Sequence, residues 1–466
     1  MEGYERTTVL AALVLLFLVV LHFAPEVSIN GTSLRRVNIL SDLLPENDST
    51  YESIVPSPKA PKTLTKIRTH SGSTVEFKEV WPKGVAPIVD YSDGQEGGMD
   101  AFYGALSKVQ SLGRPVRIAY YSDSFTEADI FTADLRELLQ QKFGGCGVGW
   151  VDLANPINSN SRRTVEQQVS SGITEYDAEH KGQSARLGIS GRYYEVGQGA
   201  MVTTNTSTPY NRFQPHSKRW QTALLYFRAH SRTTIKATVD GHAASTRQFT
   251  PSKSVQCLAM NDGGSRVSYQ FLSSGATVFG MALEPTAGIV LDNLSMRGSN
   301  GLSLKKIPEH TLADFARMRP YDLIVLHFGL NVAVQGNTPE IIKKYANDMK
   351  GVVQLFRSAF PKAAILVVSV PDREQRTASG IATMKEVHQL VACQQQLAAN
   401  CHVSFYNFFQ AMGGSGTMAA LVDRNMANKD YTHLSYGGGR LVAQKVFPSF
   451  VAGFNNYMNR KKIESK

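Results

Sequence analysis

Short, continuously apolar runs alternate with longer amphipathic segments in the C-terminal third of the chain and again near residue 116. An apolar run without alternating polar positions is typical of a strand buried on both faces. Apolar residues that recur every three or four positions predict a helix. The pattern therefore predicts an α/β fold, with a parallel sheet covered by helices on both faces. The predicted strands are residues 116–121, 322–328, 364–370 and 403–407, and the predicted helices are residues 98–112, 127–143, 338–360 and 381–399, with a last helix from about residue 434.

The middle of the chain, residues 185–290, follows a different pattern. Apolar and polar residues alternate over residues 234–239, and the Asp-Gly pair that follows is a typical hairpin turn. Helical spacing is absent from this region. We therefore expect a β-rich domain, a sandwich, inserted into an α/β domain whose two parts are residues 96–184 and 291–466.

A single apolar run, residues 9–24, stands near the N-terminus. Its length approaches the roughly 20 residues that a membrane-spanning helix needs. Pro25 follows directly and no small-x-small motif is well placed, so an uncleaved signal anchor is favoured over a cleaved signal peptide, which stays the alternative. We expect residues 1–25 to be this anchor or signal segment and residues 26–95 a linker with short strands near 74–80. The folded bulk is then expected to be extracytoplasmic, in a periplasm or at a cell surface.

Composition narrows the class of protein further. Hydrophobic residues make up 42% of the 466 positions, which excludes a mostly disordered chain. Four cysteines without a CxxC pair exclude a disulfide scaffold and argue against structural zinc. Cys393 and Cys401 could pair or stay free thiols. The net charge of +10 comes without a compact basic run, so nucleic acid is not an expected partner, while an acidic polymer or an anionic membrane surface is compatible.

Four short polar blocks follow predicted strands or precede the last helix. Because the carboxyl ends of parallel strands meet at one edge of a sheet, we expect the blocks to converge there. A serine hydroxyl is a poor nucleophile until a base removes its proton, and a histidine held by a carboxylate can be that base. The blocks are Ser122-Asp123-Ser124, Gly298-Ser299-Asn300-Gly301 after residues 288–294, Gly329-Leu330-Asn331, and Asp430-Tyr431-Thr432-His433.

In this order the blocks resemble the SGNH (GDSL-type) superfamily of serine esterases and acyltransferases. The resemblance covers roughly residues 95–155 and 285–460 and implies a flavodoxin-like, three-layer sheet. It implies Ser124, Asp430 and His433 as the catalytic residues. Backbone N–H groups of Ser124 and Gly301 and the amide of Asn331 would form the oxyanion hole.

The chain departs from the family pattern at one position and offers one competing motif. The family has Gly before the Asp of its first block, and this chain has Ser122. A second string, Gly188-Ile189-Ser190-Gly191, could supply the oxyanion donor instead. We prefer Gly301, because residues 192–195 after that string form a strand candidate at the start of the insert.

The resemblance implies a serine esterase that removes O-acyl groups, with O-acetyl favoured, from an extracytoplasmic carbohydrate. No metal or organic cofactor is expected. Two alternatives stay open. The same residues could transfer acetyl to a cell-envelope polysaccharide, supplied by a membrane acyltransferase partner, or the chain could be an inactive glycan-binding protein, which Ser122 would favour.

Several other residues have a candidate role and a plainer interpretation. Tyr210, Phe213 and Trp220 could stack on sugar rings if the insert binds carbohydrate, but ordinary core packing is favoured. His327, beside the predicted site, is interpreted as packing, and His388 and His402 as structural or surface residues.

Overall fold

The computed structural model describes residues 8–10, 13–14, 17, 28–29, 32–33, 53–60, 64–94, 97–273, 275–378 and 380–466. It divides into two units, of which the larger comprises Ser53–Glu374 and Thr383–Lys466 and contains the candidate site. The other unit is Met1–Glu52 with Gln375–Ala382. Short two-stranded sheets pair β1 (Ser28–Ile29) with β2 (Thr32–Ser33), and β21 (Glu374–Thr377) with β22 (Gly380–Thr383).

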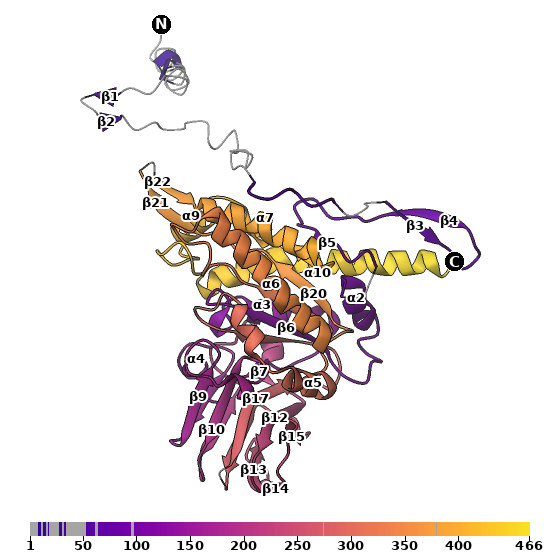
Figure 1. Ribbon diagram of the computed structural model, residues 1–466, viewed down its shortest axis with the longest axis vertical. Helices are drawn as coiled ribbons and strands as arrows, with labels where there is room; N and C mark the ends of the chain where they lie inside the picture. The colour runs from indigo at the N-terminus through magenta and orange to yellow at the C-terminus, as the bar shows by residue number, and fades with distance from the viewer. Residues whose placement is uncertain are drawn as a thin grey trace. The chain divides into compact units, whose positions relative to one another are not determined.

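A six-stranded sheet with the order β18-β6-β19-β20-β23-β5 organises the larger unit (Figure 1). The first five strands run parallel and β5 is antiparallel. In chain order the parallel strands give 2-1-3-4-5, the flavodoxin-like arrangement. Every residue of β6, β19 and β20 is buried, which explains their continuously apolar sequences. The strands are β5 (Ile88–Asp90), β6 (Val116–Ser122), β18 (Ile289–Ser295), β19 (Leu323–His327), β20 (Ala364–Val368) and β23 (Ser404–Tyr406).

Helices cover both faces of this sheet. The connection from β6 to β18 runs in the opposite direction to those from β19 to β20 and β23. Right-handed crossovers therefore place α3 on one face and α6 and α7 on the other. In agreement, α3 packs against α10 and α6 against α7 (Figure 1). The helices are α2 (Met99–Ser107), α3 (Thr132–Phe143), α4 (Pro156–Asn160), α5 (Glu309–Met318), α6 (Pro339–Ala359), α7 (Lys385–Asn400), α8 (Phe408–Met412), α9 (Thr417–Asp423) and α10 (Tyr436–Glu464), with 3-10 turns η2 (Glu127–Asp129), η3 (Ser184–Arg186), η4 (Pro215–Lys218) and η5 (Leu302–Lys306).

Two antiparallel sheets form a sandwich between α3 and β18. One has the order β15-β12-β17-β10-β9, with β7 also paired to β17, and the other β14-β13-β16-β11-β8. The predicted fold class, a flavodoxin-like α/β domain with an inserted sandwich, is therefore confirmed. The strands are β7 (Gly149–Val151), β8 (Glu166–Val169), β9 (Ile173–Asp177), β10 (Arg192–Val196), β11 (Met201–Asn205), β12 (Thr222–Ala229), β13 (Thr233–Val239), β14 (Ser245–Phe249), β15 (Gln256–Met260), β16 (Arg266–Phe271) and β17 (Ala276–Glu284).

The insert begins earlier than predicted. Strands β7, β8 and β9 belong to its sheets, so the expected boundary at residue 185 is wrong by more than thirty positions. The sequence Glu-Gln-Gln-Val of β8 has one buried residue, Gln167, so no apolar alternation marks this strand. Its place in the sheet comes from pairing with β11.

The six-stranded sheet of the sandwich packs its outer face against the α/β domain. Trp150 and Tyr226 stack there with ring centroids 5.8 Å apart, and Phe315 of α5 packs edge-on against Trp150. A buried ion-pair network crosses the same interface, because Glu284 at the end of β17 pairs with Arg117 of β6 and with Arg319. Aromatic packing and buried ion pairs thus hold the inserted sandwich against the α/β domain.

The chain enters and leaves the sandwich at one narrow point. A Cβ on Gly288 would lie 2.5 Å from the Cα of Gly145, and a Cβ on Gly145 would clash with the carbonyl oxygen of Ile289, so neither position tolerates a side chain. Both glycines have a positive φ, 122° at Gly145 and 91° at Gly288. The N–H of Ile289 also donates to the carbonyl of Gly144 at 2.9 Å. We call this point, formed by Gly144, Gly145 and Gly288, the glycine neck.

The predicted linker, residues 26–95, is shorter than expected. A hairpin of β3 (Leu64–Arg68) and β4 (Thr74–Lys78) lies beside α10, since the N–H of His70 donates to the carbonyl of Glu464. Strand β5 adds an antiparallel edge to the main sheet. Most of the predicted anchor, residues 9–24, lies outside the described residues, and within the described part no helix is both long and apolar enough to cross a bilayer.

Candidate active site

Ser124 stands on the turn that follows the central strand β6. Its neighbours Asp123 and Phe125 are buried, whereas Ser124 itself is half-buried and open to a ligand. Ser122 is the last residue of β6, pairs regularly with Ser295 and His327, and does not have a positive φ. This position therefore needs no glycine conformation, and the departure from the family pattern does not distort the turn.

The structure brings Ser124, His433 and Asp430 into one hydrogen-bonded chain. The Ser124 Oγ lies 2.9 Å from the His433 Nε2, and the His433 Nδ1 lies 2.7 Å from the Asp430 Oδ2. An ionised carboxylate can only accept hydrogen bonds, so the proton of the neutral ring belongs on Nδ1. The Nε2 then accepts the hydrogen bond of the serine hydroxyl, as a general base must.

The spacing of three residues between Asp430 and His433 places both on one tight turn. The Asp430 Oδ1 accepts the backbone N–H groups of Thr432 at 3.0 Å and His433 at 3.1 Å, while Oδ2 faces the ring. Burial opposes ionisation of this carboxyl, but the hydrogen bonds from His433 and Thr432 outweigh it and lower the pKa of Asp430. Helix α10 is capped by Ser435 instead, so Asp430 is not a helix cap.

The two other predicted oxyanion donors are held by Ser299. Gly301 has a φ of 87°, and a Cβ there would meet the Phe328 ring at 2.8 Å. Its N–H donates to the Ser299 Oγ at 3.0 Å, so this predicted donor already has a partner in the structure. The Asn331 Nδ2 donates to the Ser299 carbonyl at 2.8 Å, which leaves its second amide hydrogen for another acceptor. The competing string at Gly188 forms the turn before β10, where the Gly188 N–H donates to the carbonyl of Arg192.

Asp123 joins the serine turn to the asparagine loop, a role that the sequence interpretation missed. Its Oδ1 accepts the N–H of Phe125 at 3.0 Å, and Gly329 and Leu330 also hydrogen-bond to it through their backbone. Burial raises the pKa of Asp123 to about 6, against these hydrogen bonds and the nearby His433. The folded protein therefore holds a proton on this carboxyl more tightly than the unfolded chain does.

We expect the protein to lose stability relative to the Asp123→Asn variant as the pH rises from 4 to 7. Because the pKa is raised on folding, the stabilisation is complete below the unfolded value near 4 and is lost as pH passes the folded value. The difference in free energy of unfolding between the two proteins should change by about 3 kcal/mol over this interval. Urea unfolding of both proteins at four pH values measures this difference. A difference that stays constant with pH would contradict the raised pKa of Asp123.

Arg373 is a second residue that no sequence pattern singled out. Its Nη1 donates to the carbonyls of Leu330 at 2.5 Å and Ala333 at 3.1 Å, so it supports the loop that carries Asn331. A lone arginine between a strand and a helix carries no motif, and only its contacts reveal it.

The remaining histidines lie outside this chain of hydrogen bonds. His327 is buried, its Nδ1 lies 2.8 Å from the Tyr120 hydroxyl, and burial lowers its pKa to about 3. It is a neutral packing residue beneath Phe125, with ring centroids 5.7 Å apart. His388 packs against Phe409, and His402 occupies a left-handed turn after α7.

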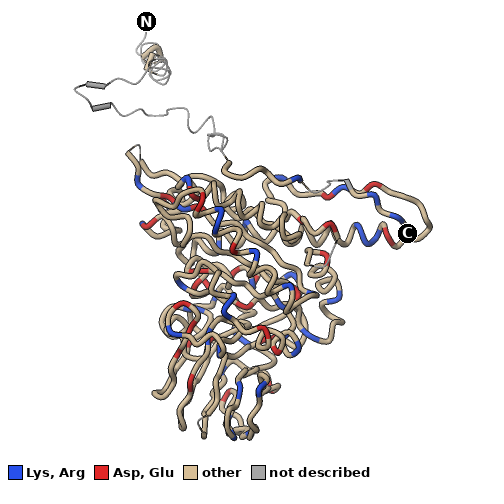
Figure 2. Tube along the Cα trace, viewed as in Figure 1, with Lys and Arg blue, Asp and Glu red and all other residues tan. Residues whose placement is uncertain are grey.

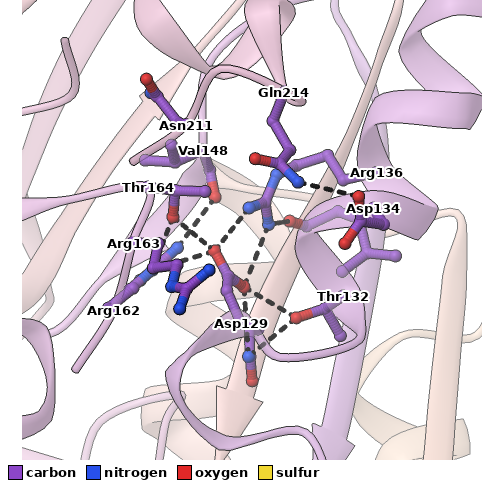
Figure 3. Close-up of polar contacts among 12 residues, drawn as sticks. Asp129, Thr132, Asp134, Arg136, Val148, Arg162, Arg163, Thr164, Asn211 and Gln214 are labelled. Atoms are coloured by element: carbon purple, nitrogen blue, oxygen red, sulfur yellow. Dashed lines mark hydrogen bonds and ion pairs between the residues drawn. The ribbon is translucent and has the colours of Figure 1, made fainter. Parts of the chain in front are cut away.

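A buried polar network is centred on Asp129, five residues after Ser124 (Figure 3). Asp129 points its carboxylate at Arg136 and Thr132 of the α/β domain and at Arg162 and Thr164 of the insert. Both Ala128 and Asp129 have left-handed φ angles, 56° and 61°. We call this set of five side chains, centred on Asp129, the Asp129 network. It fixes the backbone that leads away from Ser124.

The three aromatic residues of the insert that were candidates for sugar stacking differ in burial. Trp220 is buried in the sandwich core, as the packing interpretation predicted. Tyr210 and Phe213 are 62% and 47% exposed, so that interpretation is wrong for them. The guanidinium of Arg440 lies 3.5 Å from the Phe213 ring centroid. Tyr210 and Arg440 line a small polar pocket with Tyr436, three residues after His433.

The open question of a disulfide is also answered. Cys393 and Cys401 are both buried and both free thiols. Among the described residues no cluster of histidine, cysteine, aspartate and glutamate side chains could hold a metal ion.

A solved structure has the same fold. A peptidoglycan O-acetylesterase superposes with a TM-score of 0.64 at 20% identity, and the match covers 79% of this chain and 99% of that one. A family two carbohydrate esterase from Cellvibrio japonicus matches at 10% identity over 63% of this chain and 99% of its own, with a TM-score of 0.25, too low to show a common fold. No protein-family model and no curated protein matches the sequence.

Proposed function

We propose that the protein is a serine esterase that removes O-acetyl groups from an extracytoplasmic carbohydrate through an acyl-enzyme. The observation that carries this proposal is the hydrogen-bonded chain from the Ser124 Oγ through the His433 ring to Asp430. Ser124 meets His433 and Asp430, which lie some three hundred positions later in the chain, in a geometry that can activate a hydroxyl. The fold shared with a peptidoglycan O-acetylesterase supports the substrate class.

The reaction proceeds in two halves. In the first, His433 takes the proton of Ser124 as Oγ attacks the ester carbonyl, and the resulting imidazolium is stabilised by Asp430. The protonated ring then gives its proton to the leaving sugar oxygen. In the second half a water molecule attacks the acyl-serine, and His433 again removes and returns the proton. The N–H of Ser124 and the amide of Asn331 face the developing oxyanion, and Gly301 joins them when a ligand replaces Ser299 as its acceptor.

The apolar run at residues 9–24 supports a location outside the cytoplasm, with the folded unit tethered to a membrane. The exposed ring of Tyr210 offers a face on which a sugar ring can stack. Both features fit a polymeric carbohydrate substrate at the cell envelope.

A fluorophosphonate probe tests the proposed nucleophile. Incubation of the folded protein should give one covalent adduct, which peptide mass spectrometry maps to Ser124, and turnover of 4-nitrophenyl acetate should stop in proportion to labelling. Ser303 is a suitable control, because its Oγ contacts Glu179 and not a histidine. Persistent labelling of the Ser124→Ala variant, or an adduct on another serine, would overturn the assignment.

Replacing Asn331 by alanine should lower kcat for 4-nitrophenyl acetate by about 10²- to 10³-fold, because one oxyanion donor is lost. KM should change little, since the donor acts mainly on charge that develops in the transition state. Asn337→Ala is the matched control, as Asn337 donates to the Val332 carbonyl in the same loop. Equal losses in both variants would indicate a loop defect and not a lost oxyanion contact.

A further inference from the structure

A second cavity, of about 530 Å³, opens between the end of β12, the segment before β15 and the first turns of α5. This volume lies within the range of small-ligand sites in proteins. Side chains from both domains line it, because Arg228 and Lys253 come from the insert and His310 from the α/β domain. None of its residues takes part in the hydrogen-bonded chain at Ser124.

The cavity is lined by more basic than acidic side chains. The basic lining residues are Arg228, His230, Lys253 and His310, and the acidic lining residue is Asp314. That carboxylate is already engaged, since it accepts the N–H of Val255 at 2.9 Å and pairs with Arg317. Acidic and basic residues are otherwise interspersed along the trace of the chain (Figure 2). The cavity therefore has a local positive field without a free counter-charge among its lining residues.

Arg228 gives a second, independent indication of a ligand. Its side chain is 9% exposed, its Nη2 donates to the Thr311 hydroxyl at 3.1 Å, and its closest approach to Asp314 is 4.0 Å. Its Nε is buried and has no hydrogen-bond partner within the described residues. Burial, followed by the charges of Arg186 and Arg228, lowers the pKa of the neighbouring His230. A buried guanidinium normally has its donors satisfied.

We infer that this cavity binds an acidic sugar, one that carries a carboxylate or a phosphate, in the polymer whose ester groups the proposed active site removes. An oxyanion would accept hydrogen bonds from Arg228 and pair with Lys253, while the cavity volume accommodates the sugar ring. Because the ligand would touch both the sandwich and α5, its binding would also tighten the docking of the insert. The inference on the polymer rests on the proposed function, but the binding test below does not.

The test measures binding directly with the full folded protein. Calorimetric titration with inorganic phosphate, polygalacturonate and neutral dextran should give saturable binding of the first two and none of the third. Lys253→Ala combined with His310→Ala, both exposed positions, should weaken binding of phosphate and polygalacturonate at least tenfold. Lys236→Ala, an exposed lysine on β13, is the matched control and should bind as the parent does.

The possible results of these titrations test the anion site, the acidic sugar and the proposed esterase activity separately. Absence of saturable anion binding, or unchanged affinity in the double variant, overturns the site. Binding of phosphate without polygalacturonate overturns the acidic sugar in favour of a free small anion. Turnover of 4-nitrophenyl acetate should be the same in all variants, so a protein that binds the anions but has no esterase activity would refute the proposed function and leave the anion site standing.

Discussion

Replacing Ser124 by alanine is expected to abolish ester hydrolysis, with kcat falling by about five to six orders of magnitude. Without Oγ there is no acyl-enzyme, and the hydrogen bond to the His433 Nε2 is lost. Turnover of 4-nitrophenyl acetate and of an O-acetylated polysaccharide should both fall to the level of the uncatalysed reaction with the remaining oxyanion donors. Stopped assays with the purified parent and the Ser124→Ala variant measure this fall in kcat.

The fold should survive this substitution, because Ser124 is half-buried and its hydroxyl has one side-chain contact among the described residues, with the partly exposed ring of His433. A His433→Ala variant provides the comparison. Residues that act as one unit give non-additive losses, so the double variant should be no slower than either single one. Losses that multiply would show that the two side chains work independently, contrary to the geometry.

Replacing Asp129 by alanine is expected to destabilise the protein by about 3–5 kcal/mol, because it removes the only carboxylate of the Asp129 network among the described contacts. Arg136 is completely buried and Arg162 nearly so, and both guanidiniums would lose their ionic partner. In the folded protein burial opposes ionisation, but these two arginines hold the pKa of Asp129 far below its usual range. Urea unfolding at neutral pH measures the loss.

Asp348→Ala supplies the control, because Asp348 pairs with Lys344 on the exposed surface of α6. A solvent-exposed pair of this kind contributes little to stability, so the variant should unfold close to the parent. If Asp129→Ala costs as little as Asp348→Ala, then water reaches the arginines and the network does not hold the insert to the serine turn.

The parallel sheet could be predicted because its strands are buried on both faces and therefore carry an uninterrupted apolar sequence, as β19 and β20 do. The catalytic residues could be proposed because the carboxyl ends of parallel strands converge and because Asp430 and His433 share one turn. Their distances could not be known from the sequence. The site thus depended on the order of blocks along the sheet more than on any one residue.

Other features left no mark on local sequence. Strand β8 is polar and is defined by its partner β11, and the short strand β5 follows a stretch without periodicity. Asp123 and Arg373 both hydrogen-bond to the loop at Leu330, although Asp123 lies 207 positions before Leu330 and Arg373 lies 43 positions after it. Such long-range pairing is a property of the folded chain, and a propensity or a local motif does not carry it.

The glycine neck has a consequence for how this architecture can change. Because both crossings of the chain meet at Gly145 and Gly288, the whole sandwich could be excised or exchanged as a cassette without altering the order of the parallel strands. A replacement would still have to supply partners for Arg117 and Arg319 and cover the rings at Phe315. Exchange of the sandwich is therefore easy at the glycine neck, where the chain enters and leaves it. It is constrained at the surface that packs against the α/β domain.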